Sequence, residues 1–439
     1  MFYRGFRAVV ALLLRLFYRF EAVSDPHRGL SRDGPVIFVG NHPNGLVDPG
    51  IVFTTTARHV TFLAKAPLFK MPFLGWMLKW MDALPVFRKQ DNLGETTKNE
   101  STLTASIEAL VAGRAITLFP EGKSHSEPQL AELKTGCARI ALEAVRRGAK
   151  VQIVPIGLNY RQKDRFRSRV KVEVGPAVDP SQFVPTDGED PHDAARRLTD
   201  GIADALRAVT LNLEQWGDLP LIETAEALYA LKVGERAKDQ DRLRAFARGM
   251  QLLRDEQPQR FEQLKNEVLA FQNRLSMVDA KARELTYSYR PATVAWFTLR
   301  NLLWLAGLPT ALVGITLFVI PYWIPILVVK GVKPPEDVEA TVKVLTLLLL
   351  APLWLGLLTA IAWFSFGWPL GLGTLLGTLP LGLFTRYYFE RRASALRDVR
   401  MFLVLASRKR LKARLLAEGE ALAAQIEAVA EELRPRVVA

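Results

Sequence analysis

The sequence predicts an α/β domain with a central mixed sheet flanked by helices, followed by an α-helical linker and C-terminal transmembrane helices. Between about residues 34 and 212, short β-rich runs alternate with helical stretches, which is typical of an α/β domain. Beyond residue 300, two long runs contain no charged residue. The predicted parts are an amphipathic interfacial helix (1–22), the α/β domain (30–214), an amphipathic helical region (220–290), the membrane region (296–388) and a basic helical tail (389–439).

Within the α/β domain, runs rich in β-branched and aromatic residues predict the strands, and periodic apolar residues predict the helices. A segment rich in Pro, Asp and Gly, 176–191, predicts a loop. The expected strands are 36–40, 60–64, 84–87, 115–119, 151–157 and 170–174. The expected helices are about 99–112, 130–147 and 192–212.

The charge balance limits the class of partner. The 439 residues carry a formal net charge of +13, which favours an anionic partner, either nucleic acid or an acidic lipid surface. No helix-turn-helix, aromatic RNA-binding or zinc pattern is visible, and the basic residues lie beside long apolar runs. We therefore expect anionic membrane lipids as partners and no nucleic acid.

Cysteine usage indicates the compartment. The single cysteine, Cys137, cannot form an internal disulfide, which favours a catalytic domain facing the cytoplasm, at the inner membrane if the protein is bacterial. We expect Cys137 to be a small buried hydrophobe. Because no cluster of acidic or cysteine residues is visible, no metal is expected.

The N-terminal twenty residues predict an amphipathic helix. Its four arginines, Arg4, Arg7, Arg15 and Arg19, fall within about a third of the helical wheel, and phenylalanines and leucines occupy the rest. Arg15 interrupts the apolar stretch, which argues against a signal peptide. The helix is expected to lie in the headgroup region of a membrane, the alternative being a helix docked on the protein itself.

The segment from about 222 to 286 has apolar residues at three- and four-residue spacing and is broken at Pro258. This pattern predicts two or more long amphipathic helices. They could form a regulatory or dimerising arm, or they could pack on their own domain.

Two uncharged runs predict membrane-spanning helices. Asn301 to Val329 is 29 residues long and Val344 to Thr385 is 42, while one crossing needs about 20 residues. Length suggests three crossings, but basic residues flank both ends, which favours an even number. The prolines of the first run could make it a hairpin, or the Gly- and Pro-rich stretch 367–382 could be re-entrant.

Candidate catalytic residues follow the first expected strand. In VIFVGNHPNGLVDPG, His42 comes directly after an apolar strand and Asp48 follows six positions later. Sites in α/β sheets form at the carboxyl ends of strands. A carboxylate beside His42 could orient the ring and raise its basicity, so that its other nitrogen takes a proton from a hydroxyl. A structural turn histidine is the alternative for this motif taken alone.

Further polar residues follow later strands. Arg88 lies beyond LPVF, and Glu121, Gly122 and Lys123 lie beyond ITLFP. Cations at strand ends are suited to binding a phosphate monoester, although Arg88 or Lys123 could each be a solvated loop charge. Gly122 permits close approach of the backbone to a ligand.

Four motifs in order, histidine-turn-Asp, VFR, FPEG and VPIG, resemble the sequence blocks of the glycerol-phosphate acyltransferase family, which includes lysophosphatidic acid acyltransferases. The resemblance covers roughly 34–212. It implies that His42 is the general base, Asp48 its orienting carboxylate, and Arg88 a phosphate ligand. It also implies an acceptor pocket, to which we assign Glu121, Gly122, Lys123, Asn44 and His125, although His125 could equally be a surface turn residue.

Two departures from the family pattern concern the site. Five residues separate His42 from Asp48 where four are usual, so the turn must bulge. Ser124 replaces the usual arginine, which leaves Lys123 as a substitute. Both features, together with the C-terminal membrane region, resemble the fungal glycerol-3-phosphate and dihydroxyacetone-phosphate acyltransferases.

The implied reaction is attack of an acceptor hydroxyl on an acyl-CoA or acyl-carrier-protein thioester, without a further cofactor. The expected acceptor is glycerol-3-phosphate or dihydroxyacetone phosphate, and the alternative is lysophosphatidic acid or another lysophospholipid. A membrane scaffold with an inactive acyltransferase domain is the alternative outside enzymes.

Overall fold

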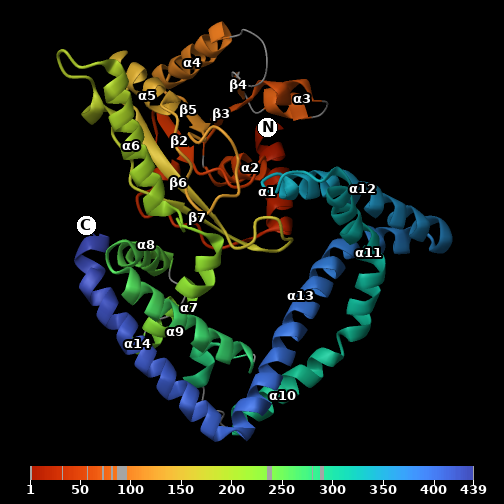
Figure 1. Cartoon of the computed structure of the whole chain (residues 1–439). Coiled ribbons are helices and arrows are strands. Elements are labelled where there is room, and N and C mark those ends of the chain that lie inside the picture. The colour runs from red at the N-terminus through yellow and green to blue at the C-terminus, as the bar shows by residue number, and fades with distance from the viewer. Residues whose placement is uncertain are drawn as a thin grey trace. The chain divides into compact units, whose positions relative to one another are not determined.

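The computed structural model describes residues 2–31, 33–56, 58–71, 74–80, 83–86, 96–234, 240–278, 280–286 and 291–438. The chain divides into two compact units (Figure 1). The first contains residues 1–212 and 328–345, and the second contains 213–327 and 346–439. We call them the α/β unit and the helical unit.

The α/β unit contains a seven-stranded sheet with the order β1-β7-β6-β2-β5-β3-β4. All neighbouring strands are parallel except β6 and β7, so the sheet is mixed, as predicted. The strands are β1 (Arg19–Phe20), β2 (Val36–Gly40), β3 (Val60–Lys65), β4 (Leu84–Val86), β5 (Ala115–Leu118), β6 (Gln152–Tyr160) and β7 (Arg169–Val174).

Helices cover both faces of this sheet (Figure 1). Ile37 and Val39 of β2, whose side chains point to the same face, pack in one buried cluster with α4 (Thr96–Val111), α5 (Gly136–Arg146) and α6 (Pro191–Val209). On the other side, Phe53 of α2 (Val47–Thr55) contacts Phe62 of β3 with ring centroids 6.0 Å apart. The loops that follow β2 and β5 therefore begin at the centre of a well-packed sheet.

The predicted strands are confirmed, with ends that differ by at most three residues. The two-residue strand β1 and the helices α2 and α3 (Leu74–Trp80) were not expected. The helix expected at 130–147 begins only at Gly136, because residues 120–135 form the extended turn after β5. Cys137 is buried, as expected.

The N-terminal helix α1 (Phe2–Phe17) docks on α2. Leu14 and Phe17 are buried, and the Arg7 guanidinium donates to the carbonyl oxygen of Thr54 at 3.2 Å. Val9 and Leu12 remain exposed. The docking matches the alternative expected for this helix, and its contact with a membrane stays a prediction.

Four helices of the helical unit form a bundle around one buried core: α7 (Leu219–Lys232), α8 (Gln240–Glu256), α9 (Pro258–Ser276) and α14 (Lys409–Val438). Phe271, which is fully buried, lies in this core. Pro258 is the first residue of α9, where its missing N–H costs no hydrogen bond, so the expected break lies at a helix start. These helices pack on one another.

Among the described residues, three helices are long and apolar enough to cross a membrane: Leu308–Val332 (α11), Glu339–Phe366 (α12) and the first part, Trp368–Arg392, of α13 (Trp368–Ser407). They follow α10 (Pro291–Leu305). The first uncharged run contains the end of α10 and most of α11, and α11 continues through Pro321 and Pro325 instead of forming a hairpin at these prolines. Residues 368–382 are continuous helix. The even number of crossings stays a prediction.

Gly157 of β6 provides a test of packing in the α/β unit. A Cβ there would lie 2.0 Å from the carbonyl oxygen of Val209, so alanine requires a backbone shift between β6 and α6. Gly157→Ala should destabilise the unit by about 1–3 kcal/mol, the usual cost of overpacking. Thermal unfolding of the detergent-solubilised chain, followed by circular dichroism, measures this. Gly136→Ala, whose Cβ meets nothing within 4 Å, is the control and should not lower the melting temperature; equal melting of both variants would contradict the packing argument.

Candidate active site

Three neighbouring parallel strands deliver polar residues to one edge of the sheet. His42 follows β2, Glu121 follows β5, and Tyr160 is the last residue of β6. Because β2 pairs with both β5 and β6 in parallel, the three carboxyl ends lie side by side. Such edges are where α/β proteins place ligand sites.

His42 and Asp48 are in direct contact. The Nδ1 atom of His42 lies 2.9 Å from Oδ2 of Asp48, whose side chain is fully buried. The same carboxylate accepts hydrogen bonds from the backbone N–H of Asn44 at 2.6 Å and from the hydroxyl of Tyr160 at 2.6 Å. A carboxylate at Nδ1 selects the tautomer that carries its proton there, which leaves the Nε2 lone pair available.

The turn accommodates the additional residue between His42 and Asp48. Gly45 has a φ of +35°, a value that an L side chain rarely adopts, and α2 begins two residues later. Asp48 therefore lies in the first turn of α2, where the helix dipole favours a negative charge. The expected bulge is present, and the carboxylate reaches the ring.

Tyr160 was missed by the sequence analysis, although it ends the strand that contains VPIG. Burial, followed by the nearby charge of Asp48, raises the pKa of Tyr160 well above its usual value. Its hydroxyl therefore stays protonated and remains a donor to Asp48. Burial likewise raises the pKa of Tyr18, whose hydroxyl accepts a hydrogen bond from Nδ2 of Asn44 at 2.9 Å.

The imidazole ring of His42 has a second contact in addition to Asp48. It stacks on Phe119, with ring centroids 4.3 Å apart and an angle of 18° between the planes. The side chain is 15% exposed, so the ring is fixed but solvent or a ligand can reach it. This combination suits a group that exchanges protons with a bound molecule.

Glu121 lies close to His42 but points its carboxylate into the protein. Its Oε1 accepts the backbone N–H of His42 at 2.7 Å, and its Oε2 accepts the backbone N–H of Ala131 at 3.0 Å. Oε2 also accepts a hydrogen bond from Nε2 of His125. Glu121 thus positions the backbone of His42, and its direct contact with an acceptor stays a prediction.

The other predicted residues of the acceptor pocket divide into buried and exposed groups. His125 uses both ring nitrogens internally, because Nδ1 accepts the N–H of Glu127 while Nε2 donates to Glu121. The Asn44 side chain is fully buried. Gly122 has a φ of +74° and Lys123 is exposed on the same turn. Arg88 lies outside the described residues.

Lys163 is a second residue that the motifs did not indicate. Its Nζ donates to the carbonyl oxygen of Pro43 at 2.8 Å and to Oγ of Ser126 at 2.6 Å, which ties together the turns after β2 and β5. Burial lowers the pKa of Lys163, and the nearby carboxylates of Asp337 and Asp48 oppose that shift. It brings a positive charge close to the buried Asp48.

The connection between α11 and α12, together with the first residues of α12 (residues 333–343 in all), belongs to the α/β unit and contacts the turn after His42. Leu46 is the N-cap residue of α2, and its apolar side chain cannot cap the helix. The hydroxyl of Thr341 accepts the Leu46 N–H at 3.1 Å instead. In addition, Ser124 donates a hydrogen bond to the carboxylate of Asp337.

The part of the chain that the structure describes contains no group of three or more His, Cys, Asp or Glu residues that could hold a metal ion. The histidine and carboxylates at the strand ends are instead paired with one another and with backbone N–H groups. The expected absence of a cofactor stays a prediction.

Comparison with known proteins finds a family model that matches the segment containing the motifs. Residues 23–159 match the family model described as Acyltransferase, and they include His42, Asp48 and Glu121. Glycerol-3-phosphate O-acyltransferase 1 of Saccharomyces cerevisiae is 26% identical over 287 residues, which cover 45% of this chain and 38% of the yeast protein. The chloroplastic 1-acyl-sn-glycerol-3-phosphate acyltransferase of Arabidopsis thaliana is 26% identical over 130 residues, covering 29% of this chain and 33% of the plant protein.

The chain therefore spans less than two-fifths of the length of each of these two relatives. Among solved structures, the 1-acyl-sn-glycerophosphate acyltransferase of Thermotoga maritima has 20% sequence identity and a TM-score of 0.31, over 46% of this chain and 79% of that chain.

The cap that Thr341 provides for α2 can be tested. Thr341→Val keeps the shape of the side chain but leaves the Leu46 N–H without its acceptor, so the α/β unit should lose about 1 kcal/mol of stability. Hydrogen exchange of the Leu46 amide, measured by mass spectrometry on the solubilised chain, should accelerate. Thr341→Ser should restore protection, and Thr374→Val, where the hydroxyl bonds only its own helix at Leu370, is the matched control. Unchanged exchange in Thr341→Val would show that the cap contributes nothing.

Proposed function

We propose that this chain, whose residues 23–159 form an Acyltransferase-family domain, transfers a fatty acyl group from a thioester to a hydroxyl of glycerol-3-phosphate or dihydroxyacetone phosphate. The observation that carries the proposal is the contact between Nδ1 of His42 and the buried Asp48, which leaves Nε2 as the basic atom of a fixed ring. The yeast relative, by its name a glycerol-3-phosphate acyltransferase, supports the choice of acceptor.

In the proposed reaction, Nε2 of His42 takes the proton of the acceptor hydroxyl while its oxygen attacks the thioester carbonyl carbon. The imidazolium that forms is stabilised by the Asp48 carboxylate at Nδ1. The tetrahedral intermediate then collapses, the carbon–sulfur bond breaks, and Nε2 returns the proton to the departing thiolate. An oxygen ester and a free thiol result, and no covalent enzyme intermediate is needed.

The phosphate of the acceptor needs cationic partners. Arg88 and Lys123 are the candidates from the motifs, and Lys123 is exposed beside the Gly122 turn. A guanidinium binds a phosphate through two parallel hydrogen bonds, whereas a lysine supplies a point charge. Lys163 is committed to backbone and hydroxyl oxygens, so we assign it to holding the turns.

The apolar helices of the chain suit lipid chemistry. Three of them are long and apolar enough to span a bilayer, which would keep the site close to poorly soluble acyl donors and to the lipid product. We propose an integral membrane protein whose α/β unit faces the cytoplasm, where acyl-CoA or acyl-carrier-protein is the donor. The basic C-terminal segment would contact anionic lipids.

The second candidate function is transfer to lysophosphatidic acid or another lysophospholipid. It uses the same chemistry, and the match to the plant 1-acyl-sn-glycerol-3-phosphate acyltransferase favours it. In this candidate the acceptor already carries an acyl chain, whereas glycerol-3-phosphate and dihydroxyacetone phosphate carry none.

His42→Ala tests the mechanism. Membranes containing the variant should transfer labelled acyl groups to the acceptor about 10² to 10⁴ times more slowly, the contribution expected of a general base. His192→Ala changes the same residue type at an exposed position on α6 and should keep full activity. A fully active His42→Ala variant would refute the general-base role, and an inactive wild type would favour a scaffold.

An acceptor panel distinguishes the two candidates. Purified chain in lipid bilayers is given labelled palmitoyl-CoA or palmitoyl-carrier-protein with glycerol-3-phosphate, dihydroxyacetone phosphate or lysophosphatidic acid. We expect kcat/KM for glycerol-3-phosphate to exceed that for lysophosphatidic acid by at least about tenfold, equivalent to about 1.4 kcal/mol of transition-state binding. The reverse order would assign the second acylation to this chain.

A further inference from the structure

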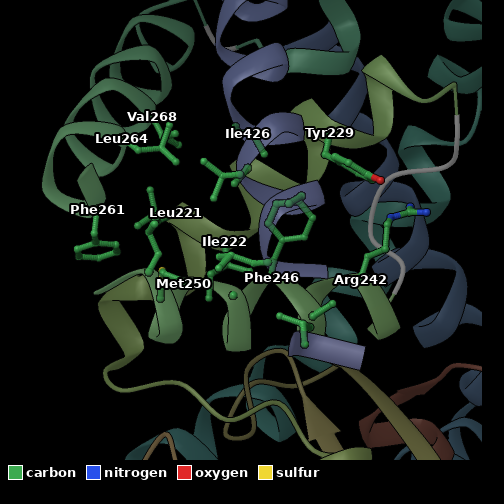
Figure 2. Close-up of a pocket in the computed structure, with 18 of the residues that line it drawn as sticks. Leu221, Ile222, Tyr229, Arg242, Phe246, Met250, Phe261, Leu264, Val268 and Ile426 are labelled. Carbon is green, nitrogen blue, oxygen red and sulfur yellow. The ribbon is translucent and has the colours of Figure 1, made fainter. Parts of the chain in front are cut away.

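The helical unit contains an apolar cavity that is lined by none of the residues assigned to acyl transfer. It has a volume of about 360 Å³ and lies among α7, α8, α9 and α14 (Figure 2). This volume is within the range of about 300–1,000 Å³ that is common for small-molecule sites. Its walls are mainly aliphatic and aromatic, including Leu221, Ile222, Phe246, Met250, Phe261 and Val268.

The charged residues that line the cavity are all basic: Arg242, Lys265 and Arg434. Arg242 lies beside Tyr229 at one end (Figure 2), and it is neutralised by the buried carboxylate of Glu226, which accepts from its Nε at 3.1 Å and from its Nη2 at 3.0 Å. This end is therefore electrically balanced.

Lys265 lines the opposite end, near Phe261, and Arg434 is the third basic residue of the lining. The Nζ of Lys265 lies 5.5 Å from the centroid of the Phe261 ring, and Phe261 packs with Leu433, the residue before Arg434. Lys265 also pairs with Glu262, one turn away on the same helix, at 3.0 Å. Because such solvent-exposed pairs contribute little, an incoming anion can replace Glu262 at low cost.

We propose that this cavity binds a single-chain anionic amphiphile, with its hydrocarbon chain among α7, α8, α9 and α14 and its head group on Lys265 and Arg434. A polar ligand would find too few partners on the aliphatic walls, whereas a hydrocarbon chain would make dispersion contacts with them. A fatty acid and a lysophosphatidic acid share the required chemistry. The site is separate from the α/β unit, so it does not depend on the proposed reaction.

The test is photo-crosslinking of the full chain in phosphatidylcholine nanodiscs, with a palmitic acid that carries a diazirine near its methyl end. Mass spectrometry should find the label on cavity-lining peptides of α8, α9 and α14. Excess palmitate should compete, and methyl palmitate, which has no charge, should compete at least about tenfold less well. Substitution of Lys265 and Arg434 by Met should remove that difference. Competition by lysophosphatidic acid at lower concentration than palmitate would identify the phosphate lipid as the better ligand.

Gly249→Leu provides a variant that fills the cavity. Gly249 lines the cavity on α8, and a Cβ there would make only ordinary contacts, 3.8 Å from Leu433 and 3.9 Å from Val437. Labelling should fall at least tenfold, while Gly136→Leu on α5 should keep it. Ala245→Leu, a second lining position, serves if Gly249→Leu does not fold. Label confined to α11–α13, or labelling that is undiminished in both filled variants, would overturn the proposed site. Equal competition by methyl palmitate and palmitate would overturn the assignment of the head group to Lys265 and Arg434.

Discussion

A carboxylate that is removed from water is stable only if hydrogen-bond donors replace its lost solvation, and Asp48 meets this requirement with three. They come from the ring of His42, the backbone of Asn44 and the hydroxyl of Tyr160. Each donor belongs to a segment whose position depends on the sheet, because β2 and β6 must end side by side. The orientation of the His42 ring therefore depends on strand pairing as much as on its own turn.

Glu121 is a second buried carboxylate, and its hydrogen-bond donors include backbone N–H groups. Its buried carboxylate receives the N–H of His42 and that of Ala131, so the turn after β5 fixes the start of the turn after β2. One carboxylate orients the imidazole ring and the other orients the peptide that carries it. Lys163 adds a third link between the two turns, and its position near Asp48 compensates part of the buried negative charge. The ring and the backbone of His42 are therefore both fixed by hydrogen bonds.

The α/β class, most strands and the meeting of His42 with Asp48 could be predicted, because they depend on local apolar patterns and on an ordered set of motifs. Tyr160 could not be identified, since its role depends on which strands are neighbours. Thr341 was beyond prediction for another reason: it lies 295 residues from its partner Leu46. The orientation of the Glu121 side chain could not be predicted either, because a motif identifies a residue but not the direction of its side chain.

The contact of residues 333–343 with the His42 turn has a consequence for inheritance and for engineering. The family match ends at residue 159, yet the α2 cap is supplied by Thr341 and the partner of Ser124 by Asp337. A recombination event or a chimera that exchanged only the N-terminal portion would separate these partners. Substitutions at Ser124 and Asp337 should therefore occur together among related chains, and the smallest transferable module is discontinuous in sequence.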